Sequence, residues 1–161
     1  MGGRPGGFLR EACEQAGLEI VDIHPPKWSV GFRDQWRKAF GLPQANWRLV
    51  RYEWELLGTD VAPARERRAA IREFDRRRDE AQRFFVTESI DYREVLEIRG
   101  VIPEHAWWRA AARSEDLYIV EGDWQWSFVL THEEKDMGIG PFLVENMSRS
   151  PNDPTTSTLD E

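Results

Sequence analysis

One stretch of the chain, residues 117–144, constrains the fold more than any other, because two strand-like runs flank a turn. Leu117 to Glu121 is β-branched and aromatic, and Gly122-Asp123 supplies the turn chemistry. Large apolar residues then alternate with smaller or polar ones at a period of two, which is typical of a strand. The apolar row is Trp124, Trp126, Phe128 and Leu130. The stretch therefore predicts a β-hairpin whose large side chains share one face and point into the core.

The remaining patterns predict an α+β domain over residues 7–145. We expect an antiparallel sheet of four or five strands with helices packed on one face. Strands are predicted at 48–56, 94–98, 117–121 and 124–131, and a further short strand at 18–23 is predicted to be buried on much of both faces. Helical spacing predicts helices at 8–16, 29–40, 63–85 and 103–114. Whether 63–85 forms one helix or two, and whether Phe84 to Thr87 begins a strand or ends a helix, stays open.

Both ends of the sequence differ in composition from this domain. Residues 1–6 are rich in glycine and proline and predict a flexible segment, and the polar residues 146–161 predict a disordered tail. Residues 1–17 lack the continuous apolar run of a signal peptide, and no stretch reaches the ~18 apolar residues of a membrane span. We therefore expect a soluble cytoplasmic protein without a membrane partner.

Charge and cysteine content exclude several classes of function. The 161 residues carry a net charge of −7, which argues against a general nucleic-acid binder because such proteins usually have a basic excess. Cys13 is the only cysteine, so one chain can form neither an internal disulfide nor a cysteine-based zinc site. The eight tryptophans indicate a core with a large aromatic share.

Several short motifs resemble domain of unknown function family 4275, a family of small bacterial proteins. Near the N-terminus they are Lys27-Trp28, followed by Trp36 and Phe40. Near the C-terminus they are Asp116-Leu-Tyr-Ile-Val, Trp124-x-Trp126, Thr131-His132-Glu133 and Gly140-Pro141-Phe142. The resemblance covers residues 18 to 144 with a poorly matched middle, where 63–83 looks like an enlargement. It implies a small α+β domain, and it carries no established activity.

His132 and Glu133 are the candidate catalytic residues. At the end of the predicted strand they could act as a general acid/base pair or contribute to a metal site, completed by a nearby acid or histidine. The residues considered for that completion are Asp123, Asp136, His24 and Glu53. The alternative is that His132 bonds to backbone at a bend while Glu133 is solvated. No His-Glu-x-x-His, Gly-x-Ser-x-Gly or paired-cysteine motif favours catalysis.

Three further features have a structural and a functional interpretation. Gly138 to Phe142 is either an anion cradle or a turn that returns Phe142 to the core, and it lacks the Lys and Ser/Thr of a phosphate loop. Most tryptophans suit the core, and Trp108 is a candidate for partner contact. The arginine-rich helix, with Arg76 and Arg77, either binds an acidic protein or a nucleic-acid backbone, or is a solvated face with ion pairs such as Glu73–Arg77.

Small size, acidity and the absence of a catalytic motif favour a non-catalytic protein-interaction module, such as an immunity or antitoxin-like protein, with a protein partner of unknown identity. The alternative is an enzyme or metal-binding protein that uses His132 and nearby carboxylates. The sequence assigns no cofactor.

Overall fold

A computed structural model describes residues 8–42, 53–59, 62–88, 93–113 and 115–146. The flexible segment predicted at 1–6 lies outside the described residues, and so does all of the predicted tail except Asn146. None of the described helices is long and apolar enough to cross a membrane.

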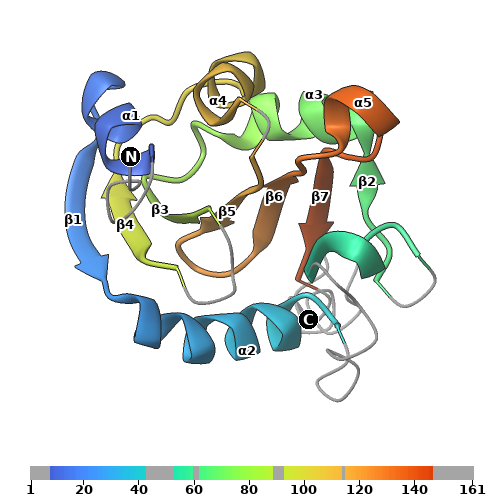
Figure 1. Ribbon diagram of the computed structural model, residues 1–161, viewed down its shortest axis with the longest axis horizontal. Helices are drawn as coiled ribbons and strands as arrows, with labels where there is room; N and C mark the ends of the chain where they lie inside the picture. Colours follow the sequence, from blue (N-terminus) through green and yellow to red (C-terminus); the bar gives the residue numbers. More distant parts are fainter. Residues whose placement is uncertain (1–7, 43–52, 60–61, 89–92, 114, 147–161) are drawn as a thin grey trace, which may run out of the picture.

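The fold is α+β, and its centre is an antiparallel sheet of seven strands in the order β1-β4-β3-β5-β6-β7-β2 (Figure 1). Their bounds are β1 Glu19–His24, β2 Arg65–Glu66, β3 Arg83–Thr87, β4 Val95–Arg99, β5 Leu117–Glu121, β6 Trp126–Leu130 and β7 Phe142–Glu145. The class and the antiparallel pairing confirm the prediction, but the expected number of four or five strands was wrong. β2 and β7 have two and four residues, too few to show a period in the sequence.

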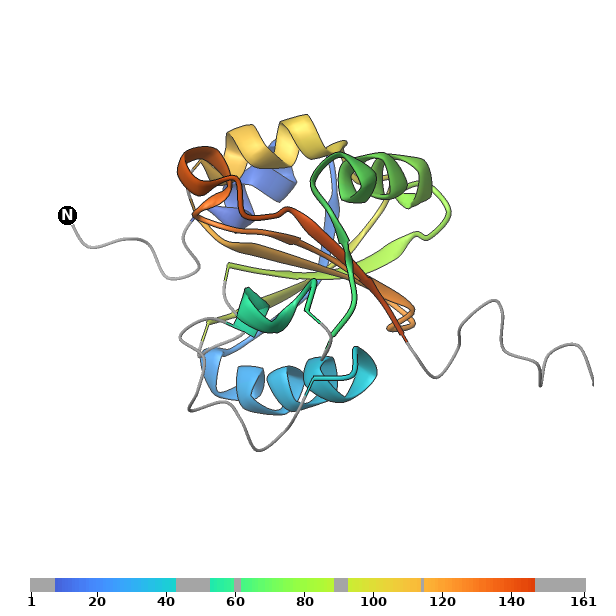
Figure 2. The same ribbon diagram turned by 90° about the vertical axis from the view of Figure 1, so that its right-hand side faces the viewer.

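Helices cover both faces of the sheet, not one as predicted (Figure 2). One face carries α1 Leu9–Gln15, α3 Arg67–Arg77, α4 His105–Ala112 and α5 Glu134–Met137. The other carries α2 Ser29–Ala39 and the short 3-10 helix η3 Glu53–Leu56, and a second 3-10 turn, η1 Pro26–Trp28, leads into α2. Every residue of β5 and β6 is buried, so these strands present apolar groups on both sides and need cover on both.

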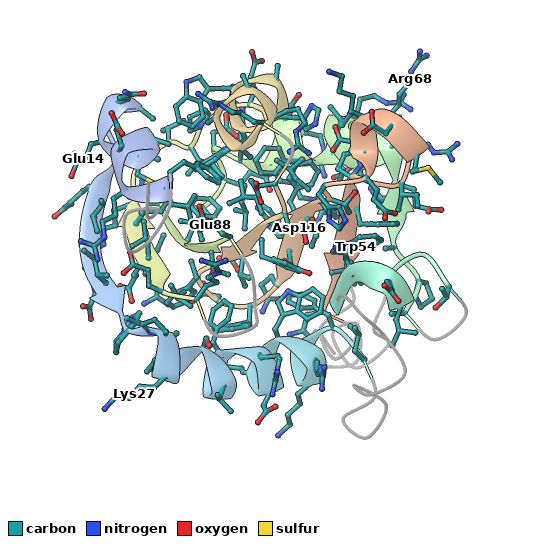
Figure 3. The ribbon with its side chains drawn as sticks, viewed as in Figure 1. Glu14, Lys27, Trp54, Arg68, Glu88 and Asp116 are labelled. Atoms are coloured by element: carbon teal, nitrogen blue, oxygen red, sulfur yellow. The ribbon has the colours of Figure 1, made fainter. Side chains whose placement is uncertain are left out.

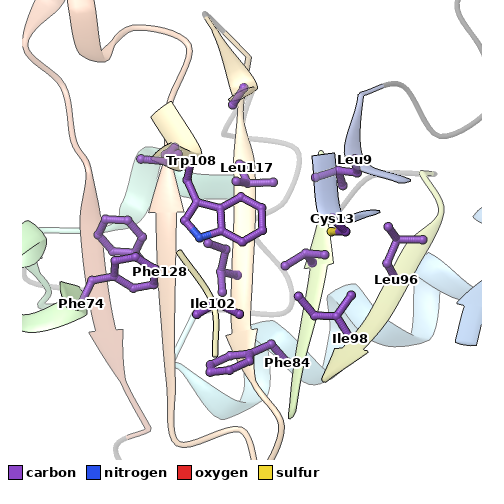
Figure 4. Close-up of a cluster of buried hydrophobic side chains, with 14 of the residues drawn as sticks. Leu9, Cys13, Phe74, Phe84, Leu96, Ile98, Ile102, Trp108, Leu117 and Phe128 are labelled. Carbon is purple, nitrogen blue, oxygen red and sulfur yellow. The ribbon is translucent and has the colours of Figure 1, made fainter. Parts of the chain in front are cut away.

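The first core lies beneath α1, α3 and α4 (Figure 4). Phe74 of α3 stacks on Phe128 of β6 with ring centroids 4.1 Å apart. Trp108 of α4 is fully buried in the same cluster. Cys13 lies there too, and burial raises the pKa of its thiol to about 12. This core joins three helices to one sheet face.

The second core lies between the sheet and α2, and its first members are Phe32, Trp36 and Phe40. These residues recur at helical spacing and form the apolar stripe predicted from the sequence. Trp36 is fully buried, and its Nε1 donates a hydrogen bond of 3.0 Å to Ser127 Oγ on β6. The buried hydroxyl of Ser127 on β6 is thus hydrogen-bonded to a side chain of α2, the helix that covers this face of the sheet.

The hairpin confirms the predicted alternation except at its tip. Trp126, Phe128 and Leu130 all belong to the first core. Trp124 does not share their face, because it lies in the turn with a φ of 60°. Its ring packs against Phe32 of the second core at 4.9 Å. The turn is longer than Gly122-Asp123, and the two tryptophans therefore lie on opposite faces.

The strand predicted at 48–56 was wrong where it can be compared. Residues 48–52 lie outside the described residues, and Glu53–Leu56 forms the 3-10 helix η3. Trp54 is nevertheless buried, at 4% exposure. The alternation of apolar and charged residues did mark an inward-facing side chain, but it did not determine the backbone conformation.

The helix predicted at 63–85 was too long at both ends. α3 is confined to Arg67–Arg77, because Arg65 and Glu66 pair with β7 and Arg67 begins the helix with a φ of 55°. The segment that follows, Arg83–Thr87, is β3, which pairs with β4 and β5. Pairing on both sides outweighs helix propensity there, so Phe84 to Thr87 belongs to a strand.

Candidate functional site

His132 lies in the turn between β6 and α5, where the strand has already ended. Its ring Nδ1 is 2.9 Å from Asp116 Oδ1, and its backbone N–H donates a 2.6 Å hydrogen bond to the same oxygen. About a third of the side chain is exposed, at 31%. The histidine is therefore held at two points and still reaches solvent.

Asp116 connects three segments of the chain. It precedes β5, and its second oxygen accepts a 3.2 Å hydrogen bond from Trp54 Nε1 of η3 (Figure 3). The Trp54 ring meets the His132 ring edge-on, with centroids 5.7 Å apart. One carboxylate thus fixes both η3 and the end of β6, which is a structural role in its own right.

The same geometry has a chemical consequence. A carboxylate that accepts from Nδ1–H favours the histidine tautomer with its lone pair on Nε2, which is the arrangement that orients a general base. Nε2 lies 3.6 Å from Glu133 Oε1, and Glu133 is 36% exposed. The structure therefore brings the two predicted residues near each other, and Asp116, which sequence reasoning missed, is the group that orients the ring.

Of the residues expected to complete a site, the three whose side chains the structure describes form no metal-holding group with His132. Asp123 lies at the opposite end of the β5–β6 hairpin, Asp136 is exposed on α5, and His24 lies on β1. The side chain of Glu53 lies outside the described part of the chain. Among the described residues, no group of three or more His, Cys, Asp or Glu side chains could hold a metal ion.

The loop Gly138 to Phe142 follows the turn interpretation. Thr131 Oγ1 donates a 2.6 Å hydrogen bond to the carbonyl oxygen of Ile139, and Gly140 adopts a φ of +80°. Phe142 is returned to the second core, at 3% exposure. The loop thus connects α5 to β7 and directs the Phe142 side chain into the second core.

Trp108 was wrongly predicted to contact a partner. Its ring is fully buried in the first core, and it is Trp107, the other member of the doublet, that is partly exposed. The two rings lie edge-on at 5.1 Å. Adjacent residues on a helix point about a hundred degrees apart around its axis, so one indole faces the core and the other faces solvent. The sequence did not determine which of the two tryptophans is buried.

Arg76 and Arg77 lie at the end of α3, beside a cleft of about 410 Å³ that Glu80, Glu121 and Glu145 also line. The predicted pair Glu73–Arg77 is present, with Arg77 Nε 2.7 Å from Glu73 Oε1. Glu73 also pairs with Arg76, and Glu145 pairs with Arg77. This pairing reduces the positive charge that an acidic partner would meet, and contact through the two arginines stays a prediction.

Substitution of Glu73 with glutamine tests this network. Hydrogen bonds from Arg76, Arg65 and Arg77 lower the pKa of Glu73 to about 2. Because the pKa of Glu73 is lower in the folded than in the unfolded chain, its ionised carboxylate stabilises the fold above the unfolded-state pKa of about 4.3. This stabilisation is lost as the pH falls through the folded-state pKa of about 2. We expect the substitution to lower the free energy of unfolding by about 1–2 kcal/mol at neutral pH, because exposed arginines are screened by water.

Urea unfolding measured between pH 7 and pH 3 checks this expectation, and the difference from wild type should shrink below pH 4. Glu80 is the control, because its side chain is 58% exposed and pairs only with Arg76 among the described residues. Its glutamine variant should stay within about 0.5 kcal/mol of wild type. A Glu73 variant whose deficit does not change with pH would contradict the ionic origin.

The strand at 18–23 was predicted to be buried on much of both faces, but most residues of β1 are exposed. It is one of the two outer strands of the described sheet, and only β4 pairs with it. Large apolar side chains are exposed along β1 and just beyond it, and we call them the edge surface: Val21, Ile23, Trp28 and Val30. They make up four of the six large apolar residues that are exposed among the described residues, so exposed apolar area gathers in one short segment.

Aromatic stacking connects the strand to the turn that follows it. The His24 ring stacks on Trp28 with centroids 3.9 Å apart and planes 13° apart, and Trp28 is 38% exposed. Trp28 also lies 5.6 Å from Phe32 of the second core. The exposed indole is therefore held in place on two sides.

Comparison of the chain with protein-family models, curated proteins and solved structures found no match in any of the three. The resemblance to domain of unknown function family 4275 stays a prediction, and any functional proposal depends on the geometry alone.

Proposed function

We propose that this protein is a non-catalytic protein-binding module of the immunity-like kind and that the edge surface receives its partner. The observation that carries this proposal is the outer position of β1 together with exposed Val21, Ile23, Trp28 and Val30. Scattered exposed apolar residues are ordinary, but a local group of them is typical of an interface. An exposed tryptophan adds weight, because this residue is enriched among those that dominate binding energy.

The edge surface suits contact through side chains better than addition of a strand. Val21 is the extra residue of a β-bulge, since Ile20 pairs with Ile98 and Asp22 with Glu97. Asp22 Oδ1 also accepts a 2.8 Å hydrogen bond from the N–H of Ile23. Bulges and side chains that cap the backbone are devices that keep an outer strand from pairing. The partner is therefore expected to be a folded protein that covers apolar side chains.

Site-specific photo-crosslinking tests the proposed function. A benzophenone amino acid is placed at Val21 or Val30, and as a control at Met137, which is 67% exposed on α5 at the far end of the sheet (Figure 1). In extracts of cells that naturally express the protein, one product should appear at both edge positions and not at Met137. The captured protein should then bind the purified full chain.

Two substitutions make the test specific. Ile23→Lys should weaken binding of the purified partner by at least about tenfold, because a charge replaces a contact made by an apolar side chain. Met137→Lys introduces the same charge on another exposed apolar residue and should change nothing. Equal crosslinking at all three positions, or equal binding by both variants, would contradict the proposed function.

The Asp116–His132 hydrogen bond favours a second candidate function, general acid/base catalysis at His132 Nε2. A panel of p-nitrophenyl esters and phosphates provides the assay. Turnover by wild type that is lost in both His132→Ala and Asp116→Asn, and kept in Lys135→Ala, would support it. Equal rates for wild type and His132→Ala would remove it.

A further inference from the structure

Two carboxylates face each other behind the edge surface. Asp22 of β1 and Glu97 of β4 are direct partners in the strand register. His24 Nε2 lies between them, 3.8 Å from Asp22 Oδ2 and 3.9 Å from Glu97 Oε1. Like charges directly opposite each other across two strands destabilise the pair unless a cation neutralises them.

No lysine or arginine among the described residues supplies that cation. Neither carboxylate forms an ion pair with a lysine or arginine of the described chain, although Lys27 and Arg99 lie nearby in the sequence and the register. His24 Nε2 is buried and makes no hydrogen bond. Glu97 is only 18% exposed, and His24 Nε2 lies 3.9 Å from its carboxylate. A mostly buried carboxylate in this state favours an incoming positive charge.

The surroundings suit a lysine or arginine side chain. Asp22 is 60% exposed, so the acid pair can be approached from solvent. Trp28, which stacks on His24, offers an exposed aromatic surface next to the carboxylates. Carboxylates beside an aromatic ring bind a guanidinium or ammonium group through charge-assisted hydrogen bonds and cation–π contact.

We infer that the partner of the edge surface inserts a lysine or arginine, flanked by apolar side chains, between Asp22 and Glu97. This inference rests on the proposed function and specifies the chemistry of the partner. The net charge of −7 argues against a second copy of this chain as the occupant, because two copies repel each other and each brings the same acids. The partner is therefore a basic protein.

Short peptides test the inference without knowledge of the partner. The 15N-labelled full chain is titrated with acetylated, amidated Ser-Ile-Arg-Ile-Ser, and with the same peptide carrying Gln or Glu in place of Arg. The arginine peptide should shift the Trp28 indole and His24 ring signals and bind at least about tenfold more tightly than the glutamine peptide. The glutamate peptide should bind most weakly.

Variants assign the preference to the acid pair. Glu97→Gln should reduce the difference between the arginine and glutamine peptides to about twofold, and Asp136→Asn, which changes an exposed acid on α5, should preserve it. Equal affinity for both peptides, or no shift at Trp28 and His24 with any of them, would overturn the inference.

These outcomes are separable from those of the crosslinking experiment. A partner captured at Val21 and Val30 that binds equally well to wild type and Glu97→Gln would preserve the proposed function and exclude the cationic contact. Absence of edge-dependent crosslinking would remove the proposed function itself.

Discussion

Replacement of Trp36 with alanine is expected to lower the free energy of unfolding by about 3–5 kcal/mol, which is the usual range for a large aromatic residue removed from a core. Trp36 is fully buried and lies 5.7 Å from Phe40 and 5.5 Å from Tyr118. The variant would leave a cavity between α2 and the sheet, and Ser127 Oγ would lose the indole donor at 3.0 Å. Urea unfolding followed by far-UV circular dichroism measures the effect.

Two controls separate packing from the hydrogen bond. Trp36→Phe keeps most of the apolar volume and loses only the donor, so a smaller decrease of about 1–2 kcal/mol is expected. Trp28→Ala removes the same side chain from a site that is 38% exposed, and it should lower stability by about 1 kcal/mol. If the Trp36 and Trp28 alanine variants were equally stable, α2 would not be packed on the sheet as described.

Replacement of Asp116 with alanine is expected to lower the free energy of unfolding by about 2–4 kcal/mol. Three donors lose their acceptor at once: the backbone N–H and ring Nδ1 of His132 and the indole Nε1 of Trp54. Trp54 is 4% exposed, so water cannot fully replace the lost partner. A buried donor left without an acceptor is destabilising by about 1–3 kcal/mol.

Hydrogen exchange gives this prediction a local readout. The Trp54 indole proton should exchange much faster in Asp116→Ala than in wild type, since η3 loses its attachment to the end of β6. Asp136→Ala, which removes an exposed acid from α5, should change neither stability nor exchange at Trp54. Unchanged protection of Trp54 in Asp116→Ala would contradict the role assigned to this carboxylate.

Periodic, self-contained elements could be predicted from the sequence. α1, α2 and α4 lie within the predicted helices at 8–16, 29–40 and 103–114, and β5 has the predicted bounds. The three helices carry apolar stripes long enough to reveal their period, and β5 stands out as a β-branched and aromatic run before a turn. β3 could not be found in this way, because it lies within the stretch 63–85 that was predicted to be helical and owes its conformation to pairing with β4 and β5.

The sequence identified His132 as a site residue but did not identify Asp116, because the position of Asp116 depends on the register of the hairpin. With Gly122-Asp123 as a two-residue turn, Asp116 would face Val129. The structure pairs Leu117 with Leu130, which places Asp116 beside Thr131 and His132. The longer turn includes Trp124, which adopts a φ of 60°. His132 was therefore identified from its place at the strand's end, whereas Asp116 required the register.

The outer strands set a condition on the order of synthesis. β1, made early, finds its sheet neighbour in Val95–Arg99, and β2 finds its neighbour in Phe142–Glu145. In a nascent chain, β1 and β2 are therefore synthesised well before the strands with which they pair. Pairing between strands that are distant in the sequence slows folding. The sheet is completed only when β7 leaves the exit tunnel, so a translational arrest upstream of Phe142 would leave β6 with an open side and α3 without the strand it packs on.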